Sequence, residues 1–229
     1  MSDQAPVMNR RERLRAQTLQ EIVDSSFAII DADGVHALSI AALARSMAMS
    51  APAVYRYFPS RDALLAHLIL LSYEQLTAAM TTAVEAAAQV PRTLVGVLVA
   101  AYRDWALSHR RRYGMLFSDR DDNVLAGKSV ETPMHQGMAM LVDLLVAIQG
   151  DAPGSTSGDR TLDGQLTHWV SSKRMPESSA GAAAAAILIW TRAHGIISLE
   201  LSGVFENSTI EARRLLDLEI DNVVRGLAG

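Results

Sequence analysis

Residues 39–65 read SIAALARSMAMSAPAVYRYFPSRDALL, and this stretch decides the fold expected for the N-terminal part of the chain. Ser39 is a favourable N-cap residue. Ile40, Leu43, Ala44 and Met47 follow it at the spacing of one buried helical face, so the helix is expected to close near Met47. The pattern predicts a short helix of about two turns.

A second short helix follows within the same stretch. Ser50 is placed to cap it, and Pro52 falls in its first turn, where a missing N–H costs little. Val54 and Phe58 form a second buried stripe, and Pro59 ends the helix. Two short helices joined by a turn of about three residues have helix-turn-helix geometry, in which the second helix lies in the major groove of DNA.

Longer helices are expected on both sides of this pair. Residues 12–32 show one apolar face, and Gly34 stands where helices end in a left-handed residue. That face consists of Leu19, Ile22, Val23, Phe27 and Ile30. Ser60 is placed to cap a fourth helix that runs to about residue 89. The helix-turn-helix is therefore expected to pack on the first helix, and the fourth to connect it to the rest of the chain.

The motif AVYRYFPSRDALL (53–65) resembles the signature of tetracycline-repressor-type regulators. That signature has an apolar residue, Tyr, any residue, an aromatic or His, Phe, then Lys or Arg and a Leu pair. Together with SIAALA (39–44), the resemblance covers roughly the first 70 residues. The family usually has Gly in the turn where this chain has Ala48. If that position needs a positive φ, the Cβ there costs about 1 kcal/mol.

The remaining sequence predicts helices throughout. They are expected at 91–112, 134–149, 162–175, 178–202 and 210–227, with cations at 109–112 placed to suit a helix C-terminus. A polar loop is expected up to about residue 132, and a mobile Gly/Ser/Pro-rich loop at 150–159. Because no segment alternates, the expected fold is all-α: a helix-turn-helix domain at 1–60 and an effector-binding and dimerisation domain at 61–229.

A second resemblance lies in the C-terminal half. The segments AYRDWALSHRRRYGMLF (101–117) and WTRAHGIISLELSGVF (190–205) resemble the C-terminal domain class named for its Trp-x-x-x-His-Gly pattern, here Trp190, His194 and Gly195. This resemblance implies an effector-binding core and a homodimer interface built from the last two helices.

Composition limits the class of protein. The chain has no cysteine, which excludes disulfides, thiolate catalysis and cysteine-ligated zinc. It shows no signal-peptide pattern and no uninterrupted apolar run near 18 residues, so a cytoplasmic protein is expected. The net charge of −4 argues against nucleic-acid binding, but residues 34–61 contain no acidic residue. Just upstream lies a basic arm at 10–15.

The candidate DNA contacts lie in these two regions. They are Arg10, Arg11, Ser39, Ser50, Ala51, Ala53, Tyr55, Arg56, Tyr57 and Arg61. We expect Tyr57 and Arg61 on phosphates, and Arg56 on a base edge or a neighbouring phosphate. Alternatively, the serines are ordinary caps, the tyrosines are core residues and the arginines are solvated surface charges. The arm either has no role, follows the DNA backbone or enters the minor groove.

Candidate effector and dimer contacts lie in the C-terminal half. The effector candidates are Tyr102, Trp105, Phe117, Met134, Met138, Trp190 and His194. These residues are equally consistent with a plain hydrophobic core, and Trp190 with His194 with a satisfied core pair. The dimer candidates are Gly195, Ile196, Leu199 and Leu218. A Gly inside a helix suggests the close approach of another helix.

These features favour a homodimeric repressor that a small apolar ligand releases from a palindromic DNA operator. The six histidines and the carboxylates show no metal spacing, phosphate loop or nucleophile signature, so no enzyme, metal or cofactor is expected. Two alternatives remain: a regulator with the same helix-turn-helix but no small-molecule ligand, and a helical interaction module that does not bind DNA.

Overall fold

The computed structural model describes residues 9–88, 90–118, 131–150, 159–173 and 180–227, with the backbone alone described at 131–135. Every regular element in these ranges is helical, as the sequence predicted. The chain divides into two compact units. Within the described residues, the first unit contains 9–72 and 109–118, and the second contains 73–108 and the ranges from 131 onward.

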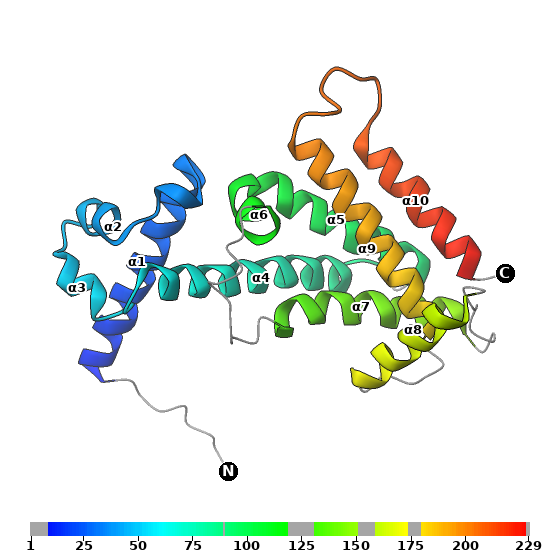
Figure 1. The fold of residues 1–229 in the computed structure, drawn as a ribbon, viewed down its shortest axis with the longest axis horizontal. Coiled ribbons are helices and arrows are strands. Elements are labelled where there is room, and N and C mark those ends of the chain that lie inside the picture. The colour runs from blue at the N-terminus through cyan, green and yellow to red at the C-terminus, as the bar shows by residue number, and fades with distance from the viewer. Residues whose placement is uncertain (1–8, 89, 119–130, 151–158, 174–179, 228–229) are drawn as a thin grey trace, which may run out of the picture. The chain divides into compact units, whose positions relative to one another are not determined.

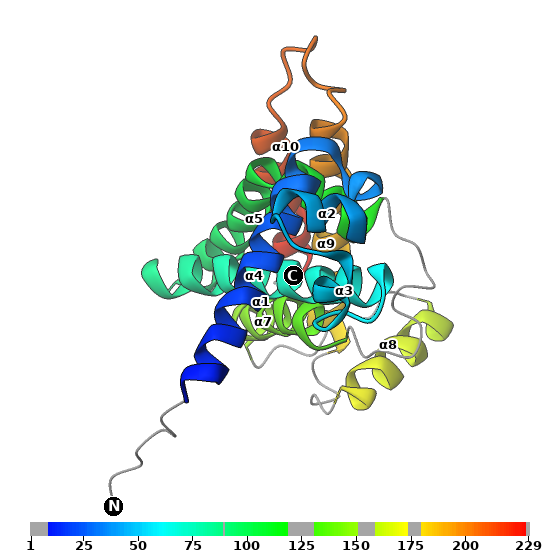
Figure 2. The same cartoon turned by 90° about the vertical axis from the view of Figure 1, so that its left-hand side faces the viewer.

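The first unit is a small helical head. It consists of α1 (Arg10–Asp33), a 3-10 turn η1 (Val35–Ala37), α2 (Ile40–Ser46), α3 (Ala51–Tyr55), the start of α4 (Arg61–Ala86), and α6 (Arg110–Phe117). Figure 2 shows α2 and α3 on one side of α1. The predicted stripes are buried, at Ile22, Phe27, Ile30, Val54 and Phe58, and α1 packs against α2, which packs against α3. The predicted packing of the helix-turn-helix on α1 is confirmed.

The turn between α2 and α3 has the strain that the sequence suggested. Ala48 has φ of 51°, the one positive φ among the described non-glycine residues. Gly34, which ends α1, has φ of 87°. A Cβ at Gly34 would also lie 2.8 Å from Nη1 at the end of the Arg111 side chain on α6, which can move aside, so glycine is favoured there by its conformation.

The second unit is a helical bundle. It contains the rest of α4, α5 (Pro91–Ser108), α7 (Glu131–Gln149), α8 (Arg160–Ser172), α9 (Ala180–Leu201) and α10 (Ala212–Leu227). Helix α9 packs against α10, α7, α8 and α5, and it runs antiparallel to α10 (Figure 1). The core includes Tyr73, Leu98, Tyr102, Leu145 and Ile197. The small residues Ala182, Ala183 and Ala186 of α9 are also buried.

The structure corrects one prediction about a helix end. Helix α5 ends at Ser108. His109 interrupts the helical conformation, because its ψ is 47°. Arg110, Arg111 and Arg112 therefore begin α6 instead of ending α5. A cation in the first turn of a helix gains nothing from the dipole, so their position reflects tertiary contacts.

One further difference concerns the boundary between the units, and three other predictions lie outside the described residues. The unit boundary falls inside α4, after Ser72, later than the expected division at 60/61, and α6 joins the first unit. The polar loop before α7, most of the loop at 150–159 and the expected cap Ser178 lie outside the described residues.

Two described helices, α4 and α9, reach the length and mean hydropathy of a membrane span despite their polar interruptions. In α4, 56% of the apolar window is buried inside the protein, as in the core helix of a globular domain. In α9 the buried share is only 39%, which leaves part of an apolar helix uncovered within one chain.

Candidate functional site

The α2–turn–α3 segment presents two helix starts. The side chain of Ser39 accepts a hydrogen bond from the N–H of Ala42 at 3.1 Å, so the predicted cap of α2 is confirmed. Ser50 occupies the N-cap position of α3, but its side chain makes no capping hydrogen bond, which corrects that prediction. The exposed Ser50 hydroxyl therefore remains available to an acceptor outside the chain.

The residues at the end of α3 differ in exposure. Tyr55 is 50% exposed, Arg56 is exposed, and Tyr57 is half-buried, as are Ala51 and Ala53. One of the two tyrosines faces outward, as expected from their spacing, and it is Tyr55.

Tyr57 is held in place by a neighbour on α1. The guanidinium of Arg15 lies over its ring, 5.6 Å from the centroid. A cation–π contact of this kind contributes about 0.5–1 kcal/mol at an exposed site and restricts the ring. Arg15 thus joins the start of α1 to the end of the helix-turn-helix, a contact that sequence spacing did not reveal.

Arg61 has a role that the sequence did not predict. Its Nε donates to the carbonyl of Leu38 at 2.7 Å, and its Nη2 donates to the carbonyl of Val35 at 3.0 Å. Its Nη1 lies 3.7 Å from a carboxylate oxygen of Asp62. The side chain, 35% exposed, thereby ties the start of α4 to the segment before α2. The expected phosphate contact would have to use the N–H groups of this guanidinium that do not donate to Leu38 or Val35.

The basic residues at 10–15 belong to a helix. Helix α1 begins at Arg10, and Asn9 and Glu12 form a capping box with reciprocal bonds of 2.9 Å. Arg10 and Arg11 therefore project from the exposed first turn of α1, and the expected arm starts as ordered helix. The carboxylate of Glu12 favours the helix N-terminus, whereas the arginines do not.

Three of the effector candidates come together in the second unit. The rings of Tyr102 and Trp190 stack with centroids 5.0 Å apart and an interplanar angle of 13°. The hydroxyl of Tyr102 lies 3.1 Å from Nδ1 of His194, and the rings of Trp190 and His194 are 6.1 Å apart. Tyr102 is buried, while Trp190 and His194 are half-buried. The cluster thus joins α5 to α9.

Burial governs the electrostatics around this cluster. Desolvation lowers the pKa of His194 below its usual value, so the neutral imidazole is favoured. Next to Tyr102 in sequence, Arg103 forms two hydrogen bonds to Glu200, with Nε at 2.8 Å and Nη2 at 2.5 Å. These bonds raise the pKa of Arg103. Both connections hold α5 against α9.

The other effector candidates are spread over both units. Trp105 is buried in the core of the second unit, and Met138 is half-buried on α7. Phe117 belongs to the first unit, where its ring lies 4.8 Å from that of Tyr113. The side chain of Met134 lies outside the described residues.

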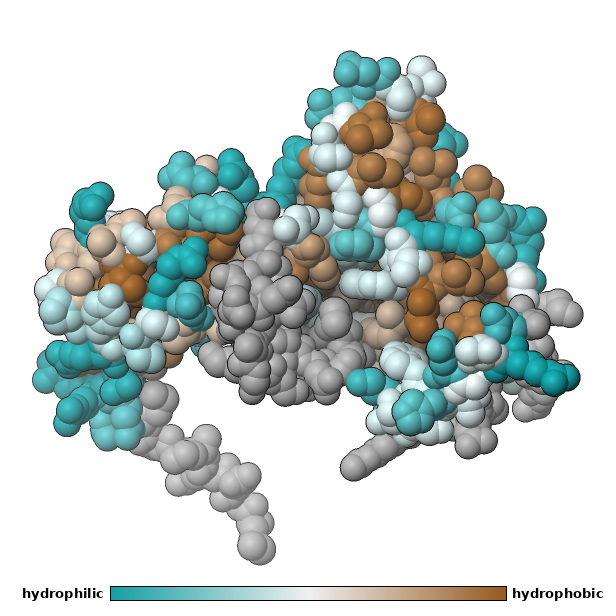
Figure 3. Space-filling model, viewed as in Figure 1, coloured by the Kyte–Doolittle hydropathy of each residue, from teal (hydrophilic) through white to brown (hydrophobic). Residues whose placement is uncertain are grey.

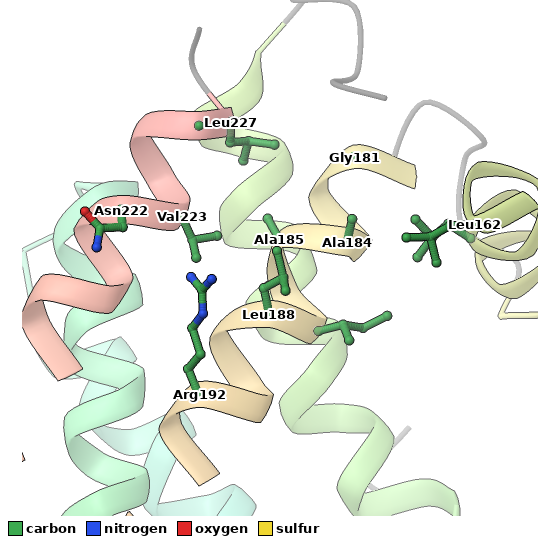
Figure 4. A pocket seen from close by; sticks show the side chains of 12 residues that line it. Leu162, Gly181, Ala184, Ala185, Leu188, Arg192, Asn222, Val223 and Leu227 are labelled. Atoms are coloured by element: carbon green, nitrogen blue, oxygen red, sulfur yellow. The ribbon is translucent and has the colours of Figure 1, made fainter. Parts of the chain in front are cut away.

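A groove crosses the second unit elsewhere, over the first half of α9. Its volume is about 460 Å³. It is lined by Leu162, Leu166, Gly181, Ala184, Ala185, Ile187, Leu188, Arg192, Asn222, Val223, Gly226 and Leu227. Figure 4 shows the floor on α9, one wall on α10 and Leu162 on the opposite side. None of the described effector candidates lines this groove, which sequence reasoning missed because its walls come from three helices.

The expected dimer residues are exposed or half-buried. Leu199 is 45% exposed and Leu218 is 52% exposed, while Gly195 and Ile196 are half-buried. No described atom lies within 4 Å of a Cβ built on Gly195, so the close helix approach expected there does not occur within one chain.

Comparison with known proteins covers both halves of the chain. Residues 22–68 match the family model described as bacterial regulatory proteins, tetR family. Residues 95–223 match the model described as tetracyclin repressor-like, C-terminal domain. The curated transcriptional regulator Rv1816 of Mycobacterium tuberculosis, of the helix-turn-helix type, is 31% identical over 111 residues. That match spans 48% of this chain and 47% of the regulator, so the chain is matched to about half the length of its curated relatives.

Solved structures match over nearly the whole chain. The structure of the regulatory protein SCO4313 is 31% identical, covers 94% of this chain and 98% of its own, and superposes with a TM-score of 0.77. A protein of unknown function from Rhodococcus sp. RHA1 is 23% identical, covers 92% and 95%, and has a TM-score of 0.71, which shows the fold alone. The helix-turn-helix head, the helical second unit and these matches agree, and the chain belongs to the tetR family of bacterial transcriptional regulators.

Proposed function

We propose that this regulator is a cytoplasmic homodimeric repressor that binds a palindromic DNA operator and is released from it by a small, mainly apolar molecule. The observation that carries this proposal is the surface of the helix-turn-helix. It presents Tyr55 and Arg56 at the end of α3, on a segment from Gly34 to Arg61 that holds no carboxylate. Such a surface suits the phosphates and base edges of a major groove.

We assign the contacts by exposure. Ser50, Ala51 and Ala53 lie at the start of α3, where a hydroxyl reaches phosphate and methyl groups reach thymine. Arg56, which no described hydrogen bond or ion pair holds, reads a base edge or contacts a neighbouring phosphate. Tyr57, oriented by Arg15, donates its hydroxyl to phosphate. Ser39, Arg10 and Arg11 complete the backbone contacts, and Arg61 supports the segment before α2.

We place the effector at the aromatic cluster of the second unit. The half-buried rings of Trp190 and His194 offer an apolar surface, and the neutral imidazole avoids a desolvated charge beside an apolar ligand. Helix α4 crosses from the first unit to the second, and it is therefore the proposed lever between ligand and DNA.

The proposed dimer uses α9 and α10 through Gly195, Ile196, Leu199 and Leu218. Two exposed leucines on adjacent helices favour burial against a second copy, since full burial of a leucine is worth about 1.5–3 kcal/mol and roughly half of each side chain remains to be covered. The variant Leu199→Glu should sediment as a monomer and lose operator affinity. A dimer with full affinity would place the interface elsewhere.

The decisive experiment is to sequence genomic fragments bound by the purified protein, followed by mobility-shift assays on the recovered sites. Recovery of a palindromic sequence supports the proposal, and recovery of fragments without a shared motif contradicts it. A thermal-shift screen with small apolar compounds then tests the ligand. A complete absence of stabilisation across the screen would favour the same regulator without a small-molecule effector.

A further inference from the structure

The first two turns of α1 carry a dense group of exposed positive charges. Residues 10–17 are all exposed, and four of these eight residues are arginines. Figure 3 shows this start of α1 as a hydrophilic surface at the lower left of the view. The helix dipole disfavours cations near a helix N-terminus, and an exposed helix end gains little from packing. The segment therefore depends on its cap and on contacts with other elements.

Local contacts favour the helical conformation of this segment. The capping box of Asn9 and Glu12 satisfies backbone donors at the start of the helix. One turn further along, the side chain of Gln17 donates to Glu21 at 2.9 Å. Pairs of this kind stabilise a helix by only a few tenths of a kcal/mol, or roughly 0.2–0.5 kcal/mol each. They act within α1 and do not join it to the helix-turn-helix.

Arg15 supplies a contact with the helix-turn-helix. Its guanidinium lies over the ring of Tyr57, 5.6 Å from the centroid. Arg15 precedes Leu19 by four residues and the buried Ile22 by seven, so it lies on the side of α1 that packs into the head. Among the described residues, no hydrogen bond or ion pair draws Arg15 away from this ring.

The other partner of this contact, Tyr57, has a backbone that the core holds. Its N–H donates to the carbonyl of Val54 at 2.9 Å, and Val54 is completely buried. The neighbouring Phe58 is buried as well, while Tyr57 itself is half-buried. The stack therefore links an exposed helix end to a fixed point at the end of the helix-turn-helix.

We propose that Arg15 is a positioning residue for DNA binding. By stacking on Tyr57, it couples the start of α1 to the end of the helix-turn-helix, so that the phosphate contacts of Tyr57 and Arg11 form together. Arg11 lies one turn before Arg15 on the same side of α1. Loss of the stack frees the ring and lets the first turns of α1 fray, which weakens both contacts. This inference rests on the proposed DNA binding and adds how two separate elements act as one surface.

Operator affinity in a double-mutant cycle tests the coupling. Arg15→Met keeps a long side chain but removes the cation. It should lower operator affinity about two- to fivefold, which is the range for a cation–π contact at an exposed site. In a Tyr57→Leu background, which offers no ring, the same change should have no further effect. Arg15→Lys retains a cation and should restore most of the affinity.

Arg13→Met is the matched control. It removes the same charge from the same exposed segment, but Arg13 lies about 200° around the helix from Arg15. Its effect on operator affinity should be equal in the wild-type and Tyr57→Leu backgrounds. If Arg15→Met also costs the same affinity in both backgrounds, Arg15 acts on DNA without Tyr57, and the positioning role is wrong.

Hydrogen exchange of the free protein tests the same coupling without DNA. Arg15→Met and Tyr57→Leu should each speed exchange of the backbone amides at 13–19 about two- to fivefold, because both remove the stack. Arg13→Met should not speed it. Unchanged exchange in Arg15→Met and Tyr57→Leu overturns the inference. If the wild-type protein selects no operator, the proposed function fails, whereas exchange that responds as expected still supports the link between α1 and Tyr57.

Discussion

At the residue scale, Ala48 is the clearest strained position, with φ of 51° in the turn between α2 and α3. Ala48→Gly should stabilise the protein by about 0.5–1 kcal/mol, because glycine adopts this conformation without a Cβ clash. The measurement is chemical denaturation. The control Ala78→Gly, at an exposed helical site, should destabilise by about 1 kcal/mol. If both variants lose the same amount of unfolding free energy, the backbone at Ala48 is not strained.

A second prediction distinguishes two roles of Arg61: holding the segment before α2 in place, and contacting DNA phosphate. Its two hydrogen bonds to the carbonyls of Leu38 and Val35 leave little of the guanidinium for phosphate. Arg61→Ala should lower thermal stability and weaken operator binding while leaving the slope of log affinity against log salt unchanged. By contrast, Arg56→Ala should flatten the slope by about one if Arg56 contacts phosphate. A flattened slope for Arg61→Ala would restore the phosphate contact first expected from the sequence.

His194 predicts how stability depends on pH. Burial lowers its pKa in the folded state, so below about pH 6.5 the unfolded chain binds a proton that the folded chain resists. The contribution of His194 is therefore present above that pH and is lost as the pH falls toward its folded pKa. His194→Gln should reduce this loss in denaturation curves between pH 7 and 5. If the wild-type protein and His194→Gln lose stability identically between pH 7 and 5, the pKa of His194 does not cause this loss.

At the element scale, the junction of α1 with α6 is the contact to test. The guanidinium of Arg112 forms hydrogen bonds to both carboxylate oxygens of Asp31 and stacks 4.0 Å above the ring of Phe27. A double-mutant cycle with Arg112→Ala and Asp31→Ala should give a coupling of about 1 kcal/mol. The pair Arg213 and Asp217, more exposed on α10, should couple by less than about 0.5 kcal/mol. Equal couplings would reduce the junction to an ordinary surface ion pair.

At the scale of the whole molecule, the proposed allostery requires a definite coupling free energy. A 100-fold loss of operator affinity on ligand binding corresponds to a coupling free energy of about 2.7 kcal/mol. Because coupling is reciprocal, bound DNA must lower the affinity for the ligand by the same factor. A confirmed ligand should change tryptophan fluorescence through Trp190. Trp190→Phe should raise the ligand concentration needed for release with operator affinity nearly intact, because Trp190 stacks on Tyr102 in the proposed effector site. Release at unchanged concentration from Trp190→Phe would move the effector site away from the aromatic cluster.

The local order of the elements followed from the sequence alone. Apolar spacing located the helices, and Ser39, Ser60 and Gly34 marked their ends, because caps and stripes act over one or two turns. The same local reasoning identified Ala48, since a left-handed turn residue is a property of the backbone at that position. Family membership was also readable, because the helix-turn-helix motif is continuous in sequence.

Only the tertiary structure decided which residues meet. Sequence placed the arginines at 110–112 at the end of a helix, but contacts with α1 make them the start of another. Arg61 faces carbonyls more than twenty positions earlier in the chain, a distance that no local pattern encodes. The groove on α9 exists only because α8 and α10 stand on either side of it. Caps and periodicity depend on neighbours in sequence, whereas ion pairs, pockets and interfaces depend on neighbours in space, and packing alone determines those.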